Sequence, residues 1–189
     1  MKIVLASASP RRRQLLKKVF DTFEVCPTDA LEVLYGKPSY AVMRTAKMKA
    51  MAYSGDADLV IASDTTVYLN GEYLGKPASR SHAIQMLSSM SNTTHRVYTG
   101  VCIKYKGKYH TFYDCSMVRF RKLPYDMIVD YVNAGNSDGK AGSYGIQDGN
   151  TDDGFVKYFK GSYDNIVGLP TEKLIRVLND MGIPTKEAE

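Results

Sequence analysis

Short apolar runs alternate with stretches of helical spacing along this chain, beginning at its first residues. Ile3 to Ala6 is an apolar run of strand length, and apolar residues recur at helical spacing from Leu15 to Phe20. Ser9 suits the N-cap of that helix, and Pro10 suits its first turn, where a missing backbone N–H costs little. The pattern predicts a strand, a tight serine loop and a helix.

Polar and charged groups crowd the start of this predicted helix. The hydroxyls of Ser7 and Ser9 and the guanidinium groups of Arg11, Arg12 and Arg13 would converge there with free backbone N–H groups at the positive end of the helix dipole. The alternative is a surface helix with a basic first turn. Because cations at that end oppose the dipole, anion binding is the favoured interpretation.

The rest of the chain continues the alternation of strands and helices, which predicts an α/β protein. Asn70 and Gly71 separate two short apolar runs and predict a type I′ hairpin. The irregular stretch 27–38, which contains Asp29 and Glu32, is either an active-site loop or an ordinary connector. We expect further strands at 22–25, 59–62, 67–69, 72–74, 95–105, 109–121 and 155–159, and helices at 40–53, 80–90, 123–134 and 171–181.

Asp64 and Thr65 follow the continuous apolar run 59–62, which has the composition of a buried central strand. Ligands of α/β sheets gather at the carboxyl ends of such strands. The hairpin would bring Lys76 back toward Asp64, where the carboxylate can hold a divalent cation or accept a proton from water and the lysine can meet phosphate charge. Asp64 as a turn or cap residue is an equally open alternative.

A glycine-rich stretch runs from Asp138 to Pro170 and contains seven glycines. Glycines in such number indicate sharp turns or close approach of the backbone to a ligand. Gln147 lies within this stretch and offers a donor and an acceptor suited to a nucleobase edge. We therefore expect a binding loop here.

Composition narrows the class of protein. The chain has 189 residues, 44% of them hydrophobic, with no run long enough to cross a bilayer and no visible export signal. Its three cysteines are widely spaced, and its three histidines show no metal-ligand spacing, so we expect a cytoplasmic protein without a disulfide framework or a zinc site. The net charge of +5 is modest and scattered, so we expect neither a nucleic-acid surface nor membrane association.

Four stretches, taken together and in order, carry a resemblance to a known family. They read Ala6-Ser7-Ala8-Ser9-Pro10-Arg11-Arg12, then Ser63-Asp64-Thr65 with Gly75-Lys76-Pro77, then Lys140-Ala141-Gly142-Ser143-Tyr144-Gly145-Ile146-Gln147, and then Gly161-Ser162-Tyr163 with Val167-Gly168-Leu169-Pro170. In this order and spacing they closely resemble the Maf family, and the match covers essentially the whole chain.

The resemblance implies a fold, an activity and a cofactor. It implies a Maf/ITPase-like mixed sheet with flanking helices, in two lobes around a central cleft, formed by residues 1–189 as one domain. The implied activity is cleavage of a nucleoside triphosphate between its α and β phosphates, which yields a nucleoside monophosphate and pyrophosphate with Mg²⁺ or Mn²⁺. Members of the family are cytoplasmic, and homodimers are common among them.

The resemblance also assigns site residues, each by its match to a family motif. Asp64 matches the catalytic acidic residue, which accepts a proton and lies near the metal. Glu32 matches an acidic position that would share the metal. Lys49 and Lys76 match lysines that face the triphosphate. The substrate-binding set implied in this way is Ser7, Ser9, Arg11, Arg12, Lys49, Thr65, Lys76 and Gln147.

The positions of Arg11, Thr65 and Gln147 separate the subfamilies. Here they resemble the group that acts on dTTP and UTP, whereas the group that acts on 7-methyl-GTP typically has tryptophan after the proline and Asp-Gln in place of Asp-Thr. Two features depart from the family pattern. Leu31 precedes Glu32 where a second acid is usual, and the stretch 148–154 is longer and more acidic than the usual glycine turn. The second departure bears on base selectivity or metal affinity.

Two alternative functions stay open at this point. Maf relatives are also named for inhibiting septum formation, which implies a regulator of cell division that binds nucleotide without turning it over. The other alternative is an enzyme of the same fold that acts on a different modified nucleotide, such as 7-methyl-GTP.

Overall fold

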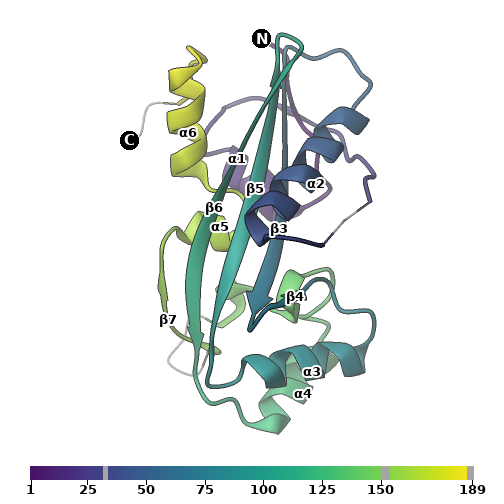
Figure 1. Ribbon diagram of the computed structural model, residues 1–189, viewed down its shortest axis with the longest axis vertical. Helices are drawn as coiled ribbons and strands as arrows, with labels where there is room; N and C mark the ends of the chain where they lie inside the picture. The colour runs from purple at the N-terminus through teal and green to yellow at the C-terminus, as the bar shows by residue number, and fades with distance from the viewer. Residues whose placement is uncertain (32–33, 150–153, 187–189) are drawn as a thin grey trace.

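The computed structural model describes residues 1–31, 34–149 and 154–186 (Figure 1). Its strands are β1 (Ile3–Leu5), β2 (Glu24–Val25), β3 (Leu59–Leu69), β4 (Glu72–Leu74), β5 (Thr94–Tyr105), β6 (Lys108–Phe120) and β7 (Val156–Lys160). Its α-helices are α1 (Pro10–Leu16), α2 (Pro38–Ala52), α3 (Arg80–Met90), α4 (Tyr125–Asn133), α5 (Tyr163–Val167) and α6 (Thr171–Asp180). Two short 3₁₀ turns, η1 (Ala141–Ser143) and η2 (Ile146–Gly149), complete the described elements.

The described strands form a single mixed sheet. Seven strands join it in the order β2-β1-β3-β5-β6-β7, with β4 paired to β3. β1 runs parallel to β2 and β3, and the other pairs are antiparallel. Asn70 and Gly71 both have positive φ values, of 50° and 93°, which confirms the expected hairpin between β3 and β4. The expected mixed α/β sheet is therefore confirmed.

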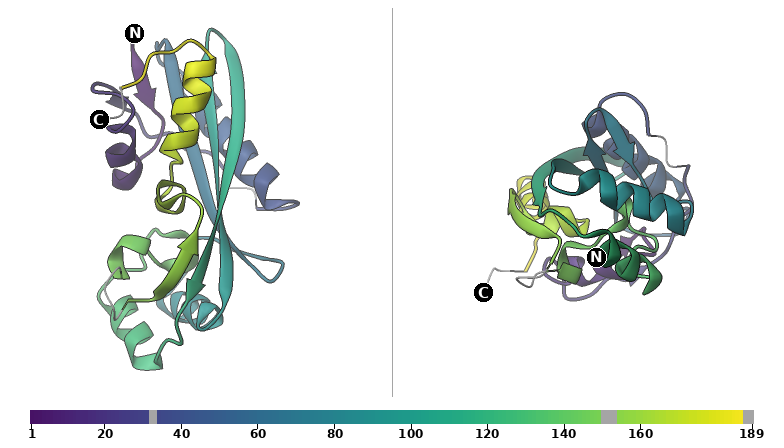
Figure 2. Two further views of the ribbon diagram at one scale, coloured as in Figure 1. Left: turned by 90° about the vertical axis from the view of Figure 1, so that its left-hand side faces the viewer. Right: turned by 90° about the horizontal axis from the view of Figure 1, so that it is seen from below.

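The long strands β3, β5 and β6 connect two lobes (Figure 1). In the first lobe, α1 and α6 cover one face of the sheet and α2 covers the other, as Figure 2 shows from two further directions. The second lobe gathers α3, α4, η1 and η2 at the far end of the long strands. Its core contains Val67, Leu87, Phe120 and Ile146, all buried. The sheet therefore runs through both lobes.

Side chains of β3 alternate between the two faces of the sheet, and this alternation decides their neighbours. Ile61 packs with Leu16 in the core under α1 and α6. Val60 and Ala62 pack with Ala46 in the core under α2. By the same alternation Asp64 faces α2, whereas Thr65 faces α1. One strand thus places a polar side chain of the candidate site on each face of the sheet.

A gap in the strand pairing along one edge of β3 lies beside these polar residues. The parallel partner β1 ends at Leu5, opposite Ile61, because the Ser7-to-Pro10 loop turns away into α1. The partner β4 pairs with β3 only from Val67 onward, where Leu74, the last residue of β4, lies opposite Val67. The intervening part of β3 therefore faces the space between the lobes.

The position of Asp64 and Thr65 within their strand corrects a prediction. The sequence suggested that the strand ends near residue 62, which would have placed Asp64 and Thr65 at its carboxyl end or made Asp64 a turn residue. Instead β3 continues to Leu69, with Asp64 opposite Gly100 and Thr65 opposite Thr99. Pairing with β5 along the whole strand outweighs the polar interruption, so the site lies at the middle of the strand.

Helix α5 was not expected from the sequence. Ser162 caps it by accepting from the backbone N–H of Asn165, and its C-terminal residue is followed by Gly168 with φ 130°. Five residues are too few for a periodic apolar pattern. Among the described residues, no helix has both the length and the apolar character required to span a membrane.

Candidate active site

A cavity of about 530 Å³ lies at the gap in the edge of β3. Its walls come from the loop after β1, from α2, from β3, from the turn after β4 and from the loop before η1. Residues 28–30 also line it, so this part of the irregular stretch 27–38 belongs to the cleft rather than to a remote connector. The residues that carry charge or hydroxyl groups into the cavity are Ser7, Ser9, Arg11, Arg12, Thr28, Asp29, Lys49, Asp64, Thr65, Thr66, Lys76 and Asp138.

Asp64 and Lys49 form an ion pair inside this cavity. Lys49 Nζ donates to Asp64 Oδ1 at 2.7 Å, and the two side chains are only 12% and 5% exposed. Helix α2 can bring Lys49 this close because its backbone passes directly over Gly100. A Cβ atom at Gly100 would lie 2.3 Å from the carbonyl carbon of Val42. The glycine therefore sets the distance between helix and sheet.

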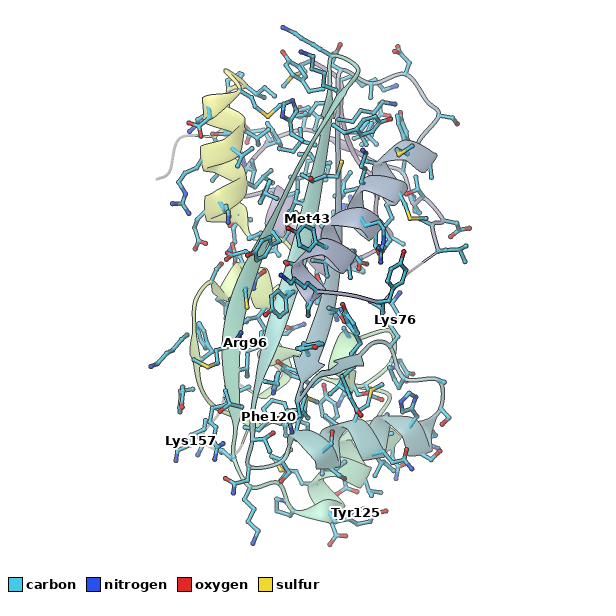
Figure 3. All side chains as sticks on the ribbon, in the orientation of Figure 1. Met43, Lys76, Arg96, Phe120, Tyr125 and Lys157 are labelled. Carbon is cyan, nitrogen blue, oxygen red and sulfur yellow. The ribbon has the colours of Figure 1, made fainter. Side chains whose placement is uncertain are left out.

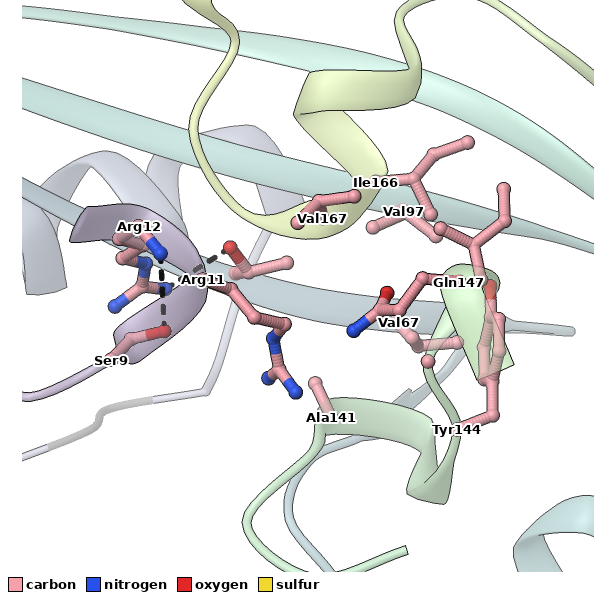
Figure 4. Close-up of a pocket in the computed structure, with 13 residues that line it drawn as sticks. Ser9, Arg11, Arg12, Val67, Val97, Ala141, Tyr144, Gln147, Ile166 and Val167 are labelled. Carbon is pink, nitrogen blue, oxygen red and sulfur yellow. Dashed lines mark hydrogen bonds between the residues drawn. The ribbon is translucent and has the colours of Figure 1, made fainter. Parts of the chain in front are cut away.

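Arg12 is held on the opposite side of the strand. Its Nε donates to the carbonyl oxygen of Gly168 at 3.1 Å, and its Nη2 donates to Thr65 Oγ1 at 3.1 Å. Its Nη1 donates to Ser7 Oγ at 3.4 Å. Ser9 caps α1 by accepting from the backbone N–H of Arg12 at 3.4 Å, as expected from the sequence. Figure 4 shows Arg12 and Ser9 beside the smaller cavity described next.

A second cavity, of about 50 Å³, adjoins the first. The two cavities share five lining residues, namely Ser9, Arg11, Arg12, Thr65 and Ala141. Apolar side chains form much of the second cavity, and Arg11 and Gln147 point into it from opposite sides (Figure 4). The apolar lining consists of Val67, Val97, Ile146, Ile166 and Val167. A small flat polar group with an apolar face would suit this lining.

Close backbone packing places the loop that carries Gln147. Gly142 has φ +67°, its N–H donates to the carbonyl oxygen of Gly75 at 3.0 Å, and a Cβ atom there would lie 2.7 Å from Val67 Cγ2. Only glycine combines this conformation with this proximity. The glycine-rich stretch thus does bring backbone into close contact, with β3 and with the turn after β4.

The same loop is anchored by a buried aromatic pair. The hydroxyl of Tyr144 lies 2.7 Å from Nε2 of His95, and both rings pack edge to face against Phe120. Burial lowers the pKa of His95 from 6.5 to about 3, and burial raises the pKa of Tyr144. The histidine is therefore neutral and structural.

Residues 2–181 match the family model described as Maf-like protein. This match spans nearly the whole chain. The chain belongs to the Maf-like protein family. Each of the four stretches that carried the resemblance contributes at least one residue to the lining of the two cavities.

Among the curated relatives of this Maf-like chain are three proteins named dTTP/UTP pyrophosphatase. The relative from Clostridium tetani is 45% identical over 193 residues, which cover 97% of this chain and 99% of the relative. The relative from Thermococcus gammatolerans is 40% identical over 181 residues, covering 95% and 96%. One from Bacillus anthracis is 39% identical over 191 residues, covering 99% of both.

The structure brings most of the expected Maf site residues together. The larger cavity holds Asp64, Lys49 and Lys76 with the residues of the serine loop, and the smaller one holds Gln147. Lys76 lies at the level where the two lobes meet (Figure 3), so the hairpin does return it toward Asp64 as expected. Glu32 falls outside the described residues, and so does the acidic part of the stretch after Gln147 at 150–153.

Two expectations about charge near the site change. Arg13 does not join Arg11 and Arg12, because it lies one step further around α1, is exposed and lines neither cavity. Asp148, the first acid after Gln147, forms an ion pair with Lys140 and accepts from the hydroxyl of Tyr131 at 2.7 Å. Burial and the Asp148 carboxylate raise the pKa of Tyr131. The negative charge of Asp148 is thus already paired within the loop.

Several groups at the site gave little or no signal in the sequence. The carbonyl oxygen of Gly168 orients Arg12, Asp138 lines the cavity, and Thr99 lies 2.9 Å from Thr65. Gly168 belongs to a motif that carried the resemblance, but its contact with Arg12 spans 156 residues of chain. Such contacts depend on the strand register, which no local pattern specifies.

The carboxylates of the cleft decide what kind of metal site it can form. Among residues 1–31, 34–149 and 154–186, no three His, Cys, Asp or Glu side chains cluster as a metal cage. Asp64 still offers carboxylate oxygen at the cavity wall. One or two carboxylates, completed by water and phosphate oxygens, are the usual setting of Mg²⁺ beside a nucleotide. The residues fit a divalent cation that shares its coordination with the substrate.

Proposed function

We propose that this Maf-like chain hydrolyses dTTP and UTP to the nucleoside monophosphate and pyrophosphate. The observation that carries the proposal is the pairing of the two cavities at one gap in β3. The larger cavity combines the Asp64 carboxylate with Lys49, Lys76 and Arg12, and the smaller one offers Gln147 in an apolar setting. The names of the relatives support the same substrates.

The cationic side chains of the larger cavity bind the triphosphate in this proposal. Arg12 is fixed from three directions by Ser7, Thr65 and Gly168, so its guanidinium can meet phosphate oxygens without first losing side-chain freedom. Lys76 adds a charge from the turn after β4. We assign the hydroxyls of Ser7 and Ser9 to the same phosphate-binding wall.

We assign Asp64 to activation of the attacking water. A water oxygen bonds to the α phosphorus, the bond from that phosphorus to the α–β bridging oxygen breaks, and pyrophosphate leaves. The water proton passes to Asp64, whose carboxylate Lys49 keeps in position through the bond to Oδ1. Lys49 thereby serves both the base and the developing phosphate charge.

A divalent cation, Mg²⁺ or Mn²⁺, would be held by Asp64, by substrate phosphates and, as the family pattern implies, by Glu32. When bound, it supplies positive charge against the phosphate oxygens. A cytoplasmic location, a homodimer, a single domain and the absence of nucleic-acid binding stay predictions.

The smaller cavity binds the nucleobase in this proposal. Gln147 offers an amide donor and acceptor that match the edge of uracil or thymine, and Arg11 adds donors from the facing side (Figure 4). The cavity is small, which favours a one-ring base over a purine. Thr65 lies where the two cavities meet and completes the set assigned to subfamily choice.

The test is pyrophosphate release from a panel of nucleoside triphosphates. The panel contains dTTP, UTP, CTP, dGTP and 7-methyl-GTP, each with Mg²⁺, with Mn²⁺ and with a chelator. The proposal expects metal-dependent release that is fastest with dTTP and UTP. Cleavage of another base alone would keep the chemistry and reject the assignment of the small cavity. Binding without cleavage of any nucleotide would instead favour the regulator.

A further inference from the structure

Helix α5 lines the smaller cavity and lies next to the residue that holds Arg12, which lines both cavities, although α5 supplies no charged group to either. Its Ile166 and Val167 line the smaller cavity, and the carbonyl oxygen of Gly168, which follows it, accepts from Arg12 Nε at 3.1 Å. Ser63 Oγ donates to the same carbonyl at 3.1 Å. The position of α5 therefore affects both the lining of the smaller cavity and the orientation of the Arg12 side chain.

A chain of hydroxyl groups links α5 to Arg12 by a second route. Thr99 Oγ1 donates to the carbonyl oxygen of Asn165 at 2.8 Å, so the single proton of Thr99 is used there. The 2.9 Å contact between Thr99 and Thr65 must then have Thr65 as donor. Thr65 Oγ1 in turn accepts from Arg12 Nη2 at 3.1 Å. Every donor direction in the series from Arg12 to Asn165 is thus determined.

Asn165 is fixed to the sheet at the far end of this series. It is fully buried, and its Nδ2 donates to the carbonyl oxygen of Val97 at 3.1 Å and to Ser116 Oγ at 2.8 Å. Ser116 Oγ donates to the carbonyl oxygen of Ser162, at the start of α5, at 2.9 Å. The helix is therefore held against β5 and β6 by directional hydrogen bonds.

Thr99 has no route to a substrate of its own. Its side chain is fully buried, and it is not among the residues that line either cavity. We propose that Thr99 is a positioning residue, which holds Arg12 in its phosphate-binding orientation through Thr65 and α5. The inference rests on the proposed function of Arg12. As a consequence, base binding in the smaller cavity and phosphate binding by Arg12 both depend on the Thr99 hydroxyl.

The experiment is a double-mutant cycle between Thr99→Val and Arg12→Ala in the full-length chain. Valine keeps the shape of threonine and removes the hydroxyl. We expect Thr99→Val to lower kcat/KM for dTTP about tenfold to a hundredfold when Arg12 is present, the scale of a misplaced binding group. In the Arg12→Ala background the same change should cost less than about twofold, because there is no guanidinium left to orient. Equal losses in both backgrounds would overturn the inference.

Two companion variants separate positioning from packing. Thr45 is also fully buried, and its hydroxyl has no hydrogen-bond partner in the described chain, so Thr45→Val should leave kcat/KM unchanged. Thr99→Ser keeps the hydroxyl and should stay within about threefold of the parent chain, whereas Thr99→Ala should repeat the loss if valine prevents folding. A Thr99→Ser variant as impaired as Thr99→Ala would contradict a role for the hydroxyl.

A readout that needs no substrate separates this inference from the proposed function. Hydrogen exchange of the Arg12 Nε–H, followed by NMR of the free protein, reports its bond to Gly168. Thr99→Val should speed this exchange at least about tenfold, while Thr45→Val should not. Faster exchange in a chain that hydrolyses no nucleotide would reject the proposed function and keep the positioning role. Unchanged exchange would reject the positioning role whatever the activity.

Discussion

Replacement of Asp64 by asparagine removes one negative charge from the cleft and little else. Asparagine has the same size, and its Oδ1 can still accept from Lys49 Nζ, which lies 2.7 Å away in the native site. The change therefore separates the chemistry of the carboxylate from its place in the fold.

The expected loss of stability is moderate. Removing one partner of a buried ion pair costs about 3–5 kcal/mol, and the two side chains here are only 5% and 12% exposed. Because asparagine retains the acceptor for Lys49, we expect a smaller cost of about 1–3 kcal/mol in the free energy of unfolding. The protein should remain folded at room temperature.

The expected loss of activity is larger. Loss of a positioned general base lowers turnover by about a hundredfold or more, which corresponds to about 2.7 kcal/mol in the activation barrier. The assay is pyrophosphate release from dTTP at saturating Mg²⁺, with urea unfolding measured in parallel. Asp58→Asn is the matched control, because Asp58 accepts from the backbone N–H of Lys2 just before β3 begins, far from the cavity. Turnover of Asp64→Asn within about threefold of the parent chain would refute the assignment of Asp64.

Three further predictions concern specificity, pH and packing. Arg11→Trp combined with Thr65→Gln should shift substrate preference away from dTTP and UTP. An unchanged order of substrates in the pyrophosphate assay would reject a role for these two residues in base specificity. His95 has its pKa lowered from 6.5 to about 3, so the unfolded chain takes up a proton that the native chain does not, and stability falls as the pH drops below 6.5 toward 3. Between about pH 7.5 and about pH 5.5 this amounts to about 1.4 kcal/mol, which His95→Gln should remove from the pH dependence of urea unfolding; parallel profiles would contradict it. Gly142→Ala places a methyl group 2.7 Å from Val67 Cγ2 at a φ of +67°, so it should lower the free energy of unfolding by about 1–3 kcal/mol, and an unchanged melting temperature would show that the loop relaxes freely.

Local patterns in the sequence predicted the parts of the fold that depend on local physics. Ser9 caps α1, and Asn70 with Gly71 makes the turn between β3 and β4, because the preferred backbone angles and side-chain bonds of these residues act over a few positions. The grouping of Asp64, Lys49 and Gln147 came instead from resemblance to the Maf family, since nothing local indicates that α2 and the glycine-rich loop meet one strand.

Contacts set by register could not be predicted in this way. The sequence placed Asp64 after the end of a strand, whereas pairing with β5 extends β3 through it. The separation of Arg12 from Arg13 follows from how α1 packs, and the contact of Arg12 with Gly168 joins opposite ends of the chain. Thr99 gave no signal, because a threonine in a β-strand is ordinary and its partner residues are known only once β3 and β5 are aligned.

The most direct test of the proposed hydrolysis is the reaction of dTTP in water enriched in ¹⁸O, with the products separated and analysed by mass spectrometry. In the proposed mechanism water attacks the α phosphorus beside Asp64, so we expect ¹⁸O in the thymidine monophosphate and none in the pyrophosphate. Label in the pyrophosphate, or release of inorganic phosphate as the first product, would contradict it.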